Sequence, residues 1–109
     1  MFGFGARIRE SSPEEASAAL RESGLLIDVR TPGEFRGGHA RGARNIPLAN
    51  LASRAGELTP QAAVHLICAS GNRSRTGARI LEKAGFSAVS SVRGGTAAWA
   101  RAGLKMERG

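Results

Sequence analysis

The segment VHLICASGNRSRTGARILEKAG, residues 64–85, decides the fold, because it passes directly from a buried strand into a helix. Residues 64–68 are apolar apart from His65, which is typical of a short buried strand. A helix is expected from Arg73 or Ser74 to Ala84, with Gly85 just past its end. The loop between the two elements begins at Cys68, the only cysteine of the chain. The segment therefore predicts a thiol at the point where a strand turns into a helix.

Strands and helices alternate along the rest of the chain. Further strands are expected at 6–9, 25–29, 43–46 and 88–92, and further helices at 13–23, 48–55 and 96–101. Ser12, Pro13 and Glu15 form a capping box that opens the first helix, and Gly24 is expected to end it. The stretch TPGEF, residues 31–35, indicates a turn or a brief helical start. This alternation predicts an α/β fold with a parallel sheet and helices on both of its faces.

The length, charge and composition of the chain exclude several classes of protein. The chain has 109 residues and a net charge of +7, enough for one domain with a modest core and a surface that attracts anions. Nucleic-acid binding is not favoured, because the arginines are scattered, aromatic residues make up 5% and no recognised motif accompanies the charge. No apolar run approaches the ~20 residues that span a membrane. The first seven residues lack the pattern of a signal peptide, so a cytoplasmic protein is expected.

Metal chemistry is not expected from this sequence. One cysteine cannot form an internal disulfide or complete a cysteine-based metal site. The two histidines, His39 and His65, are far apart along the chain, which makes a zinc site with Cys68 improbable. We therefore expect neither a metal nor an organic cofactor.

The loop after Cys68 is suited to holding an anion. A strand that turns into a helix directs loop N–H groups, and the first unpaired N–H groups of the helix, toward one point. Gly71 permits backbone angles that a side chain would forbid, and Ser74 offers a hydroxyl hydrogen bond to the sulfur. Helix N-termini also lower cysteine pKa values, which favours the nucleophilic thiolate of Cys68. We expect Arg73 to contribute to the anion site and Arg75 to extend into water.

The length of the loop limits the kind of ligand that it can surround. Cys68 to Arg73 has the spacing C-x4-R, one residue shorter than the C-x5-R of cysteine phosphatases. The shorter ring suits a single sulfur atom attached to the cysteine better than a tetrahedral oxyanion. A phosphatase or an arsenate reductase is therefore a less favoured alternative.

Four blocks in order resemble the rhodanese family in its single-domain form. They are LIDVRTPGEF (26–35), GHARGARNIPL (38–48), CASGNRS (68–74) and VRGGTAAW (92–99). The resemblance covers a core of about residues 6–104 and implies one rhodanese-like domain over 1–109 with a five-stranded parallel sheet. It implies that Cys68 carries sulfur as a persulfide held by the backbone amides of residues 69–73. The implied reaction moves sulfur from a small anionic donor such as thiosulfate to cyanide or a thiol, and the acceptor lies outside this chain.

Three residues depart from the family pattern. Ala69 follows the cysteine where many active members carry arginine or another polar residue, which removes a cation from the substrate mouth. His65 lies in the central strand where an aliphatic residue is usual, and Ala40 replaces a larger aliphatic residue. The change at Ala69 keeps a second hypothesis open, a sulfur-carrier or protein-binding module with little activity on thiosulfate.

The remaining polar residues near the blocks are interpreted as supporting groups. We expect Asp28 to accept backbone N–H groups at a strand end and Arg30 to pair with Glu34. His39 is interpreted as a hydrogen-bonded structural residue rather than a general base, and His65 as a buried neutral histidine with one hydrogen-bond partner. Gly94 and Gly95 are expected to border the active-site mouth, where the absence of side chains lets a substrate approach. Trp99 is expected to pack in the core and cover the end of the sheet.

Overall fold

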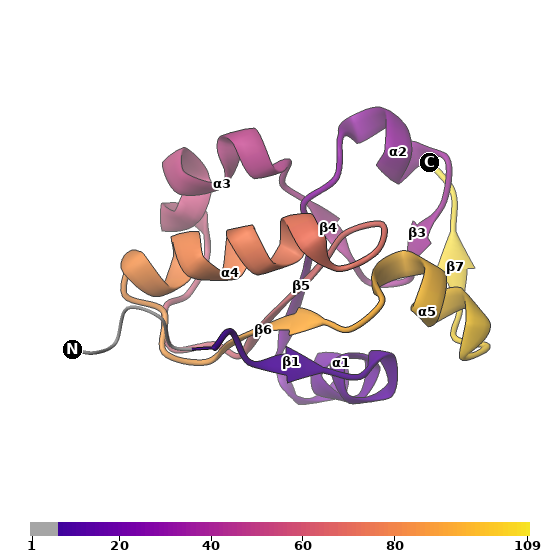
Figure 1. The fold of residues 1–109 in the computed structure, drawn as a ribbon, viewed down its shortest axis with the longest axis horizontal. Coiled ribbons are helices and arrows are strands. Elements are labelled where there is room, and N and C mark those ends of the chain that lie inside the picture. Colours follow the sequence, from indigo (N-terminus) through magenta and orange to yellow (C-terminus); the bar gives the residue numbers. More distant parts are fainter. Residues whose placement is uncertain (1–6) are drawn as a thin grey trace.

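Five parallel strands form the centre of the protein in a computed structural model, which describes residues 7–109 (Figure 1). Their order across the sheet is β1-β6-β5-β2-β4. The bounds are β1 Glu10–Ser11, β2 Leu25–Asp28, β4 Arg44–Asn45, β5 Val64–Ile67 and β6 Val89–Val92. The predicted α/β fold with a five-stranded parallel sheet is confirmed.

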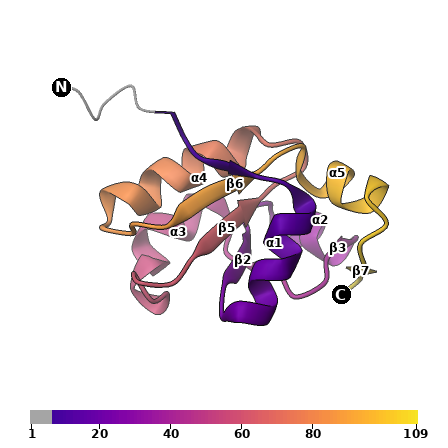
Figure 2. The same cartoon turned by 90° about the horizontal axis from the view of Figure 1, so that it is seen from below.

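Helices cover both faces of this sheet (Figures 1 and 2). α3 (Leu48–Arg54) and α4 (Asn72–Lys83) pack on one face, and α1 (Pro13–Ala19) and α5 (Gly95–Arg101) on the other. Successive strand residues point to opposite faces, so Ile27 and Leu66 join the core under α3 and α4, whereas Leu26 and Ile67 join the core under α1 and α5. Trp99 of α5 is buried in the second core, as predicted.

The first strand begins later than predicted. Residues 7–9 are not part of a strand, and Ala6 lies outside the described residues. The backbone pairs with β6 through Glu10 and Ser11, and Arg9 contributes only its carbonyl, which accepts from the N–H of Ser91. The apolar Ile8 is buried against the core without belonging to the ladder, so the Arg-Ile-Arg alternation reflects burial rather than pairing.

The first helix starts as predicted and ends differently. The Ser12 hydroxyl accepts from the N–H of Glu15 at 3.0 Å, and the Glu15 carboxylate accepts from the N–H of Ser12 at 2.7 Å. After Ala19 the chain continues as a 3-10 turn, η1 (Leu20–Glu22), and the residue with a left-handed backbone is Ser23, φ 69°. Gly24 is needed for close packing instead, since a Cβ there would lie 2.7 Å from the Ala19 carbonyl oxygen.

A second, two-stranded antiparallel sheet was not predicted. β3 (His39–Ala40) pairs with β7 (Met106–Glu107), next to α2 (Pro32–Arg36) and α5 (Figure 1). The Lys105 carbonyl accepts from the Trp99 indole N–H at 2.9 Å and from the Arg41 N–H at 3.0 Å. The folded structure therefore continues past residue 104, where the core implied by the resemblance ends. A short η2 turn (Ala55–Glu57) follows α3.

No helix in the described part of the chain combines the length and apolar composition that crossing a bilayer requires.

Candidate active site

Cys68 lies directly after β5, at the carboxyl edge of the sheet, with its side chain on the same face as Leu66. The residue is 1% exposed, and three groups of the following loop and helix surround its sulfur. The Gly71 N–H donates to Sγ at 3.0 Å and the Ser74 N–H donates at 3.3 Å. The Ser74 hydroxyl lies 3.4 Å from Sγ. The expected hydroxyl contact from Ser74 is confirmed.

The loop takes this shape because Gly71 precedes α4 in a left-handed conformation with φ 116°. That angle favours glycine, and it turns the chain so that the helix N-terminus faces back toward the sulfur. The Ser74 hydroxyl also donates to the Gly71 carbonyl at 3.1 Å, which ties the first turn of α4 to the loop. α4 begins at Asn72, one or two residues earlier than the expected start at Arg73 or Ser74.

The environment of the thiol favours its ionised form. Burial raises the pKa of the Cys68 thiol, but hydrogen bonds from the Ser74 hydroxyl and from the N–H groups of Ser74, Gly71 and Ser70 outweigh it. The net effect is a pKa below the ordinary value for cysteine. Hydrogen bonds that stabilise a charged form lower its pKa in this direction. The site therefore supplies more thiolate near neutral pH than an exposed cysteine does.

The glycines of the closing block lie against the backbone of the cysteine loop. Gly95 has φ 61°, and a Cβ there would lie 2.4 Å from the Cys68 carbonyl oxygen and 2.6 Å from that of Ala69. The Thr96 N–H donates to the Cys68 carbonyl at 2.8 Å, and its hydroxyl donates to the same oxygen at 3.1 Å. Gly94 also approaches the loop, because a Cβ on Gly71 would lie 3.7 Å from its nitrogen. The missing side chains thus let α5 contact the loop.

Asp28 and Arg30 form a buried pair at the end of β2. Arg30 donates from Nε to Oδ1 of Asp28 at 3.0 Å and from NH2 to Oδ2 at 2.8 Å, and its backbone N–H donates to Oδ1 at 2.9 Å. Arg30 NH2 also donates to the Gly38 carbonyl at 2.7 Å. The predicted pairing of Arg30 with Glu34 is wrong, because Arg30 precedes α2 and so does not share a helix face with Glu34. The backbone contact expected for Asp28 is confirmed.

Glu34 pairs instead with Arg73, the arginine of the cysteine loop. Arg73 donates from NH1 to Oε1 at 2.8 Å and from NH2 to Oε2 at 3.0 Å, and both side chains are 38% exposed. The Arg73 guanidinium, followed by the Thr31 N–H, lowers the pKa of the Glu34 carboxyl to about 2. The Arg73 side chain therefore reaches α2 and has a carboxylate partner.

Arg75 does not simply extend into water, as the sequence suggested. Its NH1 donates to Oε2 of Glu10 at 3.0 Å and its NH2 donates to the Asn72 side chain at 3.0 Å. Arg93 donates to the other oxygen of Glu10 at 3.3 Å. The carboxylate of Glu10 on β1 thus forms ion pairs with both Arg75 and Arg93 near the start of α4.

Neither histidine contacts the sulfur. The imidazole of His39 is buried, stacks on the Phe35 ring at 3.6 Å between centroids, and hydrogen-bonds the Phe35 carbonyl through Nδ1 at 2.8 Å. His65 lies on the face of β5 opposite Cys68 and is half-buried. Its Nδ1 has two partners rather than one, Ser11 Oγ at 2.9 Å and Ser90 Oγ at 2.8 Å. Burial lowers the pKa of His65, against a smaller effect of Glu15 that raises it.

The structure adds one buried polar residue that the sequence reasoning missed. Ser91 of β6 has its Oγ 2.6 Å from Ser74 Oγ and is 1% exposed. The only signal in the sequence was a polar residue inside a strand expected to be covered on both faces. Within residues 7–109, no group of three or more His, Cys, Asp or Glu side chains is placed to hold a metal ion.

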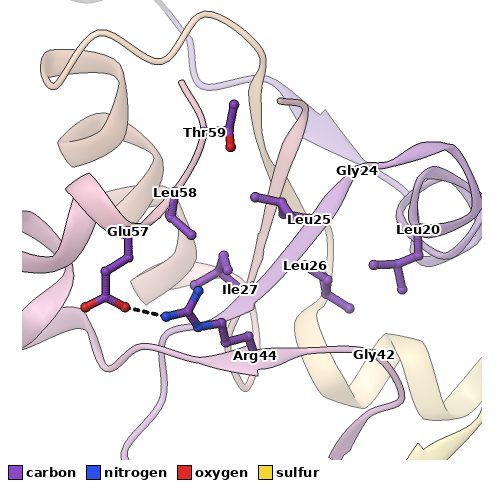
Figure 3. A pocket seen from close by; sticks show the side chains of 10 residues that line it. All are labelled: Leu20, Gly24, Leu25, Leu26, Ile27, Gly42, Arg44, Glu57, Leu58 and Thr59. Atoms are coloured by element: carbon purple, nitrogen blue, oxygen red, sulfur yellow. Dashed lines mark hydrogen bonds and ion pairs between the residues drawn. The ribbon is translucent and has the colours of Figure 1, made fainter. Parts of the chain in front are cut away.

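A hollow of about 320 Å³ lies elsewhere, beside β2 and β4 (Figure 3). Half of the residues that line it are leucine or isoleucine, and the ion pair between Arg44 and Glu57 lies on one side. None of the residues that line it belongs to the loop 68–74. The hollow therefore has no part in the chemistry of the thiol.

Comparison with known proteins agrees with this fold. Residues 12–102 match the model of the rhodanese-like domain. The chain belongs to the rhodanese family.

Its relatives include proteins named for sulfur chemistry. It is 35% identical to a sulfurtransferase of Allochromatium vinosum over 89% of this chain and 92% of the relative. It is 31% identical to the thiosulfate sulfurtransferase GlpE of Pseudomonas entomophila over 86% of both chains. It is also 38% identical to YrkF of Bacillus subtilis, whose name proposes a sulfur carrier, over 72% of this chain and 42% of YrkF.

A solved structure shares the architecture. The rhodanese-like domain of the Anabaena protein Alr3790 superposes with a TM-score of 0.83 at 27% identity, covering 91% of this chain and 78% of that one. The sequence and the fold therefore place the chain in the same family.

Proposed function

We propose that this protein is a sulfurtransferase that moves a sulfane sulfur from a small anionic donor, such as thiosulfate, to an external thiol or cyanide. The observation that carries the proposal is the position of Cys68 Sγ, 3.0 Å from the Gly71 N–H and 3.3 Å from the Ser74 N–H at the start of α4. These donors stabilise negative charge on sulfur, which the reaction creates twice. The names of the relatives support the same chemistry.

The proposed reaction is a double displacement. The Cys68 thiolate attacks the outer sulfur of thiosulfate, a new S–S bond forms, and the old S–S bond breaks so that its electron pair leaves with sulfite. An acceptor thiolate or cyanide then attacks the outer sulfur of the Cys68 persulfide. The Cys68 thiolate is released, and the product is an acceptor persulfide or thiocyanate. Cys68 is the only cysteine in this sequence, so the accepting thiol lies outside these 109 residues.

The intact mass of the protein after incubation with thiosulfate tests this proposal. A gain of one sulfur atom that disappears on addition of cyanide is the expected result. Cys68→Ser, which is nearly isosteric, should remain folded, show no such gain and have no transfer activity. Sulfur transfer by this variant above background contradicts the mechanism, and phosphate release from a phosphate ester by the unmodified protein indicates phosphatase chemistry instead.

A sulfur carrier is the second candidate. The observation that favours it is the Arg73–Glu34 pair, which neutralises a cation beside the loop, together with Ala69 in place of a polar residue. A small donor with two negative charges is attracted only weakly to a site entrance at which the arginine is already paired with a carboxylate. A protein donor can instead bind through contacts between the two protein surfaces. Loading of Cys68 from a protein persulfide much faster than from thiosulfate favours the carrier.

A further inference from the structure

Two adjacent serines in β6 belong to different polar groups. Ser90 and Ser91 are both buried, and they point to opposite faces of the sheet because they are neighbours in a strand. Ser90 Oγ contacts His65 Nδ1 at 2.8 Å and Ser11 Oγ at 3.2 Å. Ser91 Oγ contacts Ser74 Oγ at 2.6 Å, on the face where Cys68 lies. Only Ser91 is therefore connected to the thiol.

The hydroxyl of Ser74 has three neighbours and one proton. They are the Gly71 carbonyl at 3.1 Å, Cys68 Sγ at 3.4 Å and Ser91 Oγ at 2.6 Å. A hydroxyl donates one hydrogen bond and accepts up to two. If Ser74 donated to Ser91, it would have no proton left for the carbonyl or for a thiolate.

The direction of the Ser91–Ser74 bond follows from burial. Within the described residues, Ser74 Oγ is the one hydrogen-bond partner that Ser91 Oγ has. A buried hydroxyl whose proton lacks an acceptor is unfavourable. Ser91 satisfies its proton only by donating to Ser74 Oγ. While Cys68 is a thiol, its S–H donates to Ser74 Oγ. The Ser74 hydroxyl then donates its own proton to the Gly71 carbonyl.

We propose that Ser91 is a positioning residue for Cys68: by donating to Ser74 Oγ, it orients and polarises the Ser74 hydroxyl, whose proton turns from the Gly71 carbonyl to the sulfur when Cys68 is a thiolate. Ser91 never contacts the sulfur itself. A donor behind the Ser74 hydroxyl also polarises it, which strengthens the bond that Ser74 makes to the thiolate. The consequence for sulfur transfer rests on the proposed function, whereas the effect on thiolate formation does not.

The charged groups around the loop are not altered by changing Ser91. The cation nearest in sequence is Arg73 of α4, whose pKa is raised mainly by Glu34 and to a smaller extent by Cys68 and Asp28. The other charged side chains near the loop are Asp28 at the end of β2, Arg30 after it, Glu34 on α2, Arg75 on α4 with its partner Glu10 on β1, Arg93 after β6 and Arg101 on α5. A change in thiol ionisation caused by Ser91 variants is therefore assigned to the hydroxyls.

The rate of alkylation of Cys68 by iodoacetamide, measured against pH, tests the proposal without any sulfur donor. Ser91→Ala leaves the Ser74 proton free for the sulfur but removes the donor that polarises the hydroxyl, so the midpoint of the profile should move upward by roughly 0.1 to 0.6 pH unit, a fraction of one charge-assisted hydrogen bond. Below the midpoint its rate should fall about 1.3–4-fold, and well above the midpoint it should equal that of the unmodified protein. Ser90→Ala, the equally buried neighbour on the other face, should keep the original midpoint.

Ser91→Thr and Ser91→Val provide a second pair of variants with nearly the same shape, of which only the first retains a hydroxyl. The Ser91→Thr variant should keep the original midpoint of the alkylation profile, and the Ser91→Val variant should shift it as Ser91→Ala does. This pair therefore tests the role of the hydroxyl if Ser91→Ala does not fold. An unshifted midpoint in the folded Ala or Val variant, or an equal shift in Ser90→Ala, overturns the proposal. The pH profile of thiosulfate kcat/KM should move with the alkylation profile. If alkylation shifts while no variant or parent transfers sulfur, the proposed function fails and the role of Ser91 stands.

Discussion

Arg73 and Glu34 form a two-point ion pair that joins the cysteine loop and α4 to α2, with N···O distances of 2.8 and 3.0 Å. The pair brings together residues that are 39 positions apart in the sequence. It also sets the charge beside the loop, because the arginine that best fits an anion site is already neutralised.

Glu34→Gln is expected to improve the use of thiosulfate. The amide can still accept from the Thr31 N–H in the capping box, but it no longer neutralises Arg73. An exposed charge contact is worth roughly 0.2–1 kcal/mol, so KM should fall by no more than about fivefold at low salt. Steady-state kinetics at low and high salt measure this. Glu10→Gln, which frees Arg75 and Arg93 instead, is the matched control, and an equal gain in both variants removes Arg73 from the donor site.

Glu34 should also stabilise the fold in a pH-dependent way. Its pKa is lowered from 4.5 to about 2, chiefly by the Arg73 guanidinium, so the folded state favours the carboxylate. The stabilisation is present above the unfolded pKa of 4.5 and is lost as pH falls toward about 2. Both side chains are exposed, so we expect no more than about 1 kcal/mol. Urea unfolding of the parent and Glu34→Gln should differ near neutral pH and converge in acid, and a constant difference contradicts this assignment.

Ala69→Arg should increase the use of thiosulfate if the donor binds beside this position. Two charges a few ångströms apart in a partly exposed site interact by roughly 1–4 kcal/mol before desolvation is subtracted. Salt screens exposed charges over about 10 Å at 0.1 M, so the gain in kcat/KM should shrink as ionic strength rises. Ala69→Gln, which adds a polar side chain without the charge, is the control. An absent gain at low salt means that side chain 69 does not face the donor, as a protein donor would allow.

Gly95→Ala should disrupt the site by displacing α5 from the cysteine loop. Its Cβ would lie 2.4 Å from the Cys68 carbonyl oxygen, and its φ of 61° disfavours a side chain. We expect a loss of roughly 2–4 kcal/mol in unfolding free energy, from overpacking and backbone strain together, and a loss of sulfur transfer. Gly103→Ala separates the two causes, because its φ is 76° and its Cβ would have no heavy atom within 4 Å. Equal losses in both variants show that backbone strain alone is responsible.

The sequence was most informative where a pattern extended over several residues. The runs at 25–29 and 64–68 predicted strands, which the structure has at Leu25–Asp28 and Val64–Ile67, and the capping box at Ser12 predicted the helix start that the structure confirms. The position of Cys68 at a strand end predicted the loop and its hydroxyl contact with Ser74. These features are local, so they depend on few residues near one another in the chain.

The parts that could not be predicted depend on contacts between distant or short segments. β3 and β7 are two residues each, too short to carry an alternation, and Met106 and Glu107 are exposed. The contact between Ser74 and Ser91 crosses from α4 to β6, and nothing in either segment alone specifies the other. The expected pairing of Arg30 with Glu34 was wrong because Asp28, at the end of the preceding strand, lies within hydrogen-bond distance of Arg30.

The seating of α5 has an electrostatic consequence for the sulfur. Thr96 and Ala97 hold the carbonyl oxygens of Cys68 and Ala69 with their N–H groups, at 2.8 and 3.4 Å. In a trans peptide the N–H points away from the carbonyl, so fixing the Ala69 oxygen outward turns the Ser70 N–H inward, where it lowers the pKa of Cys68. The helix thus orients the peptide dipoles of the loop with their positive ends toward the thiol. Exposed side chains such as Ala97 and Ala100 can then vary freely, whereas the first backbone turn of α5 sets the field in which the sulfur reacts.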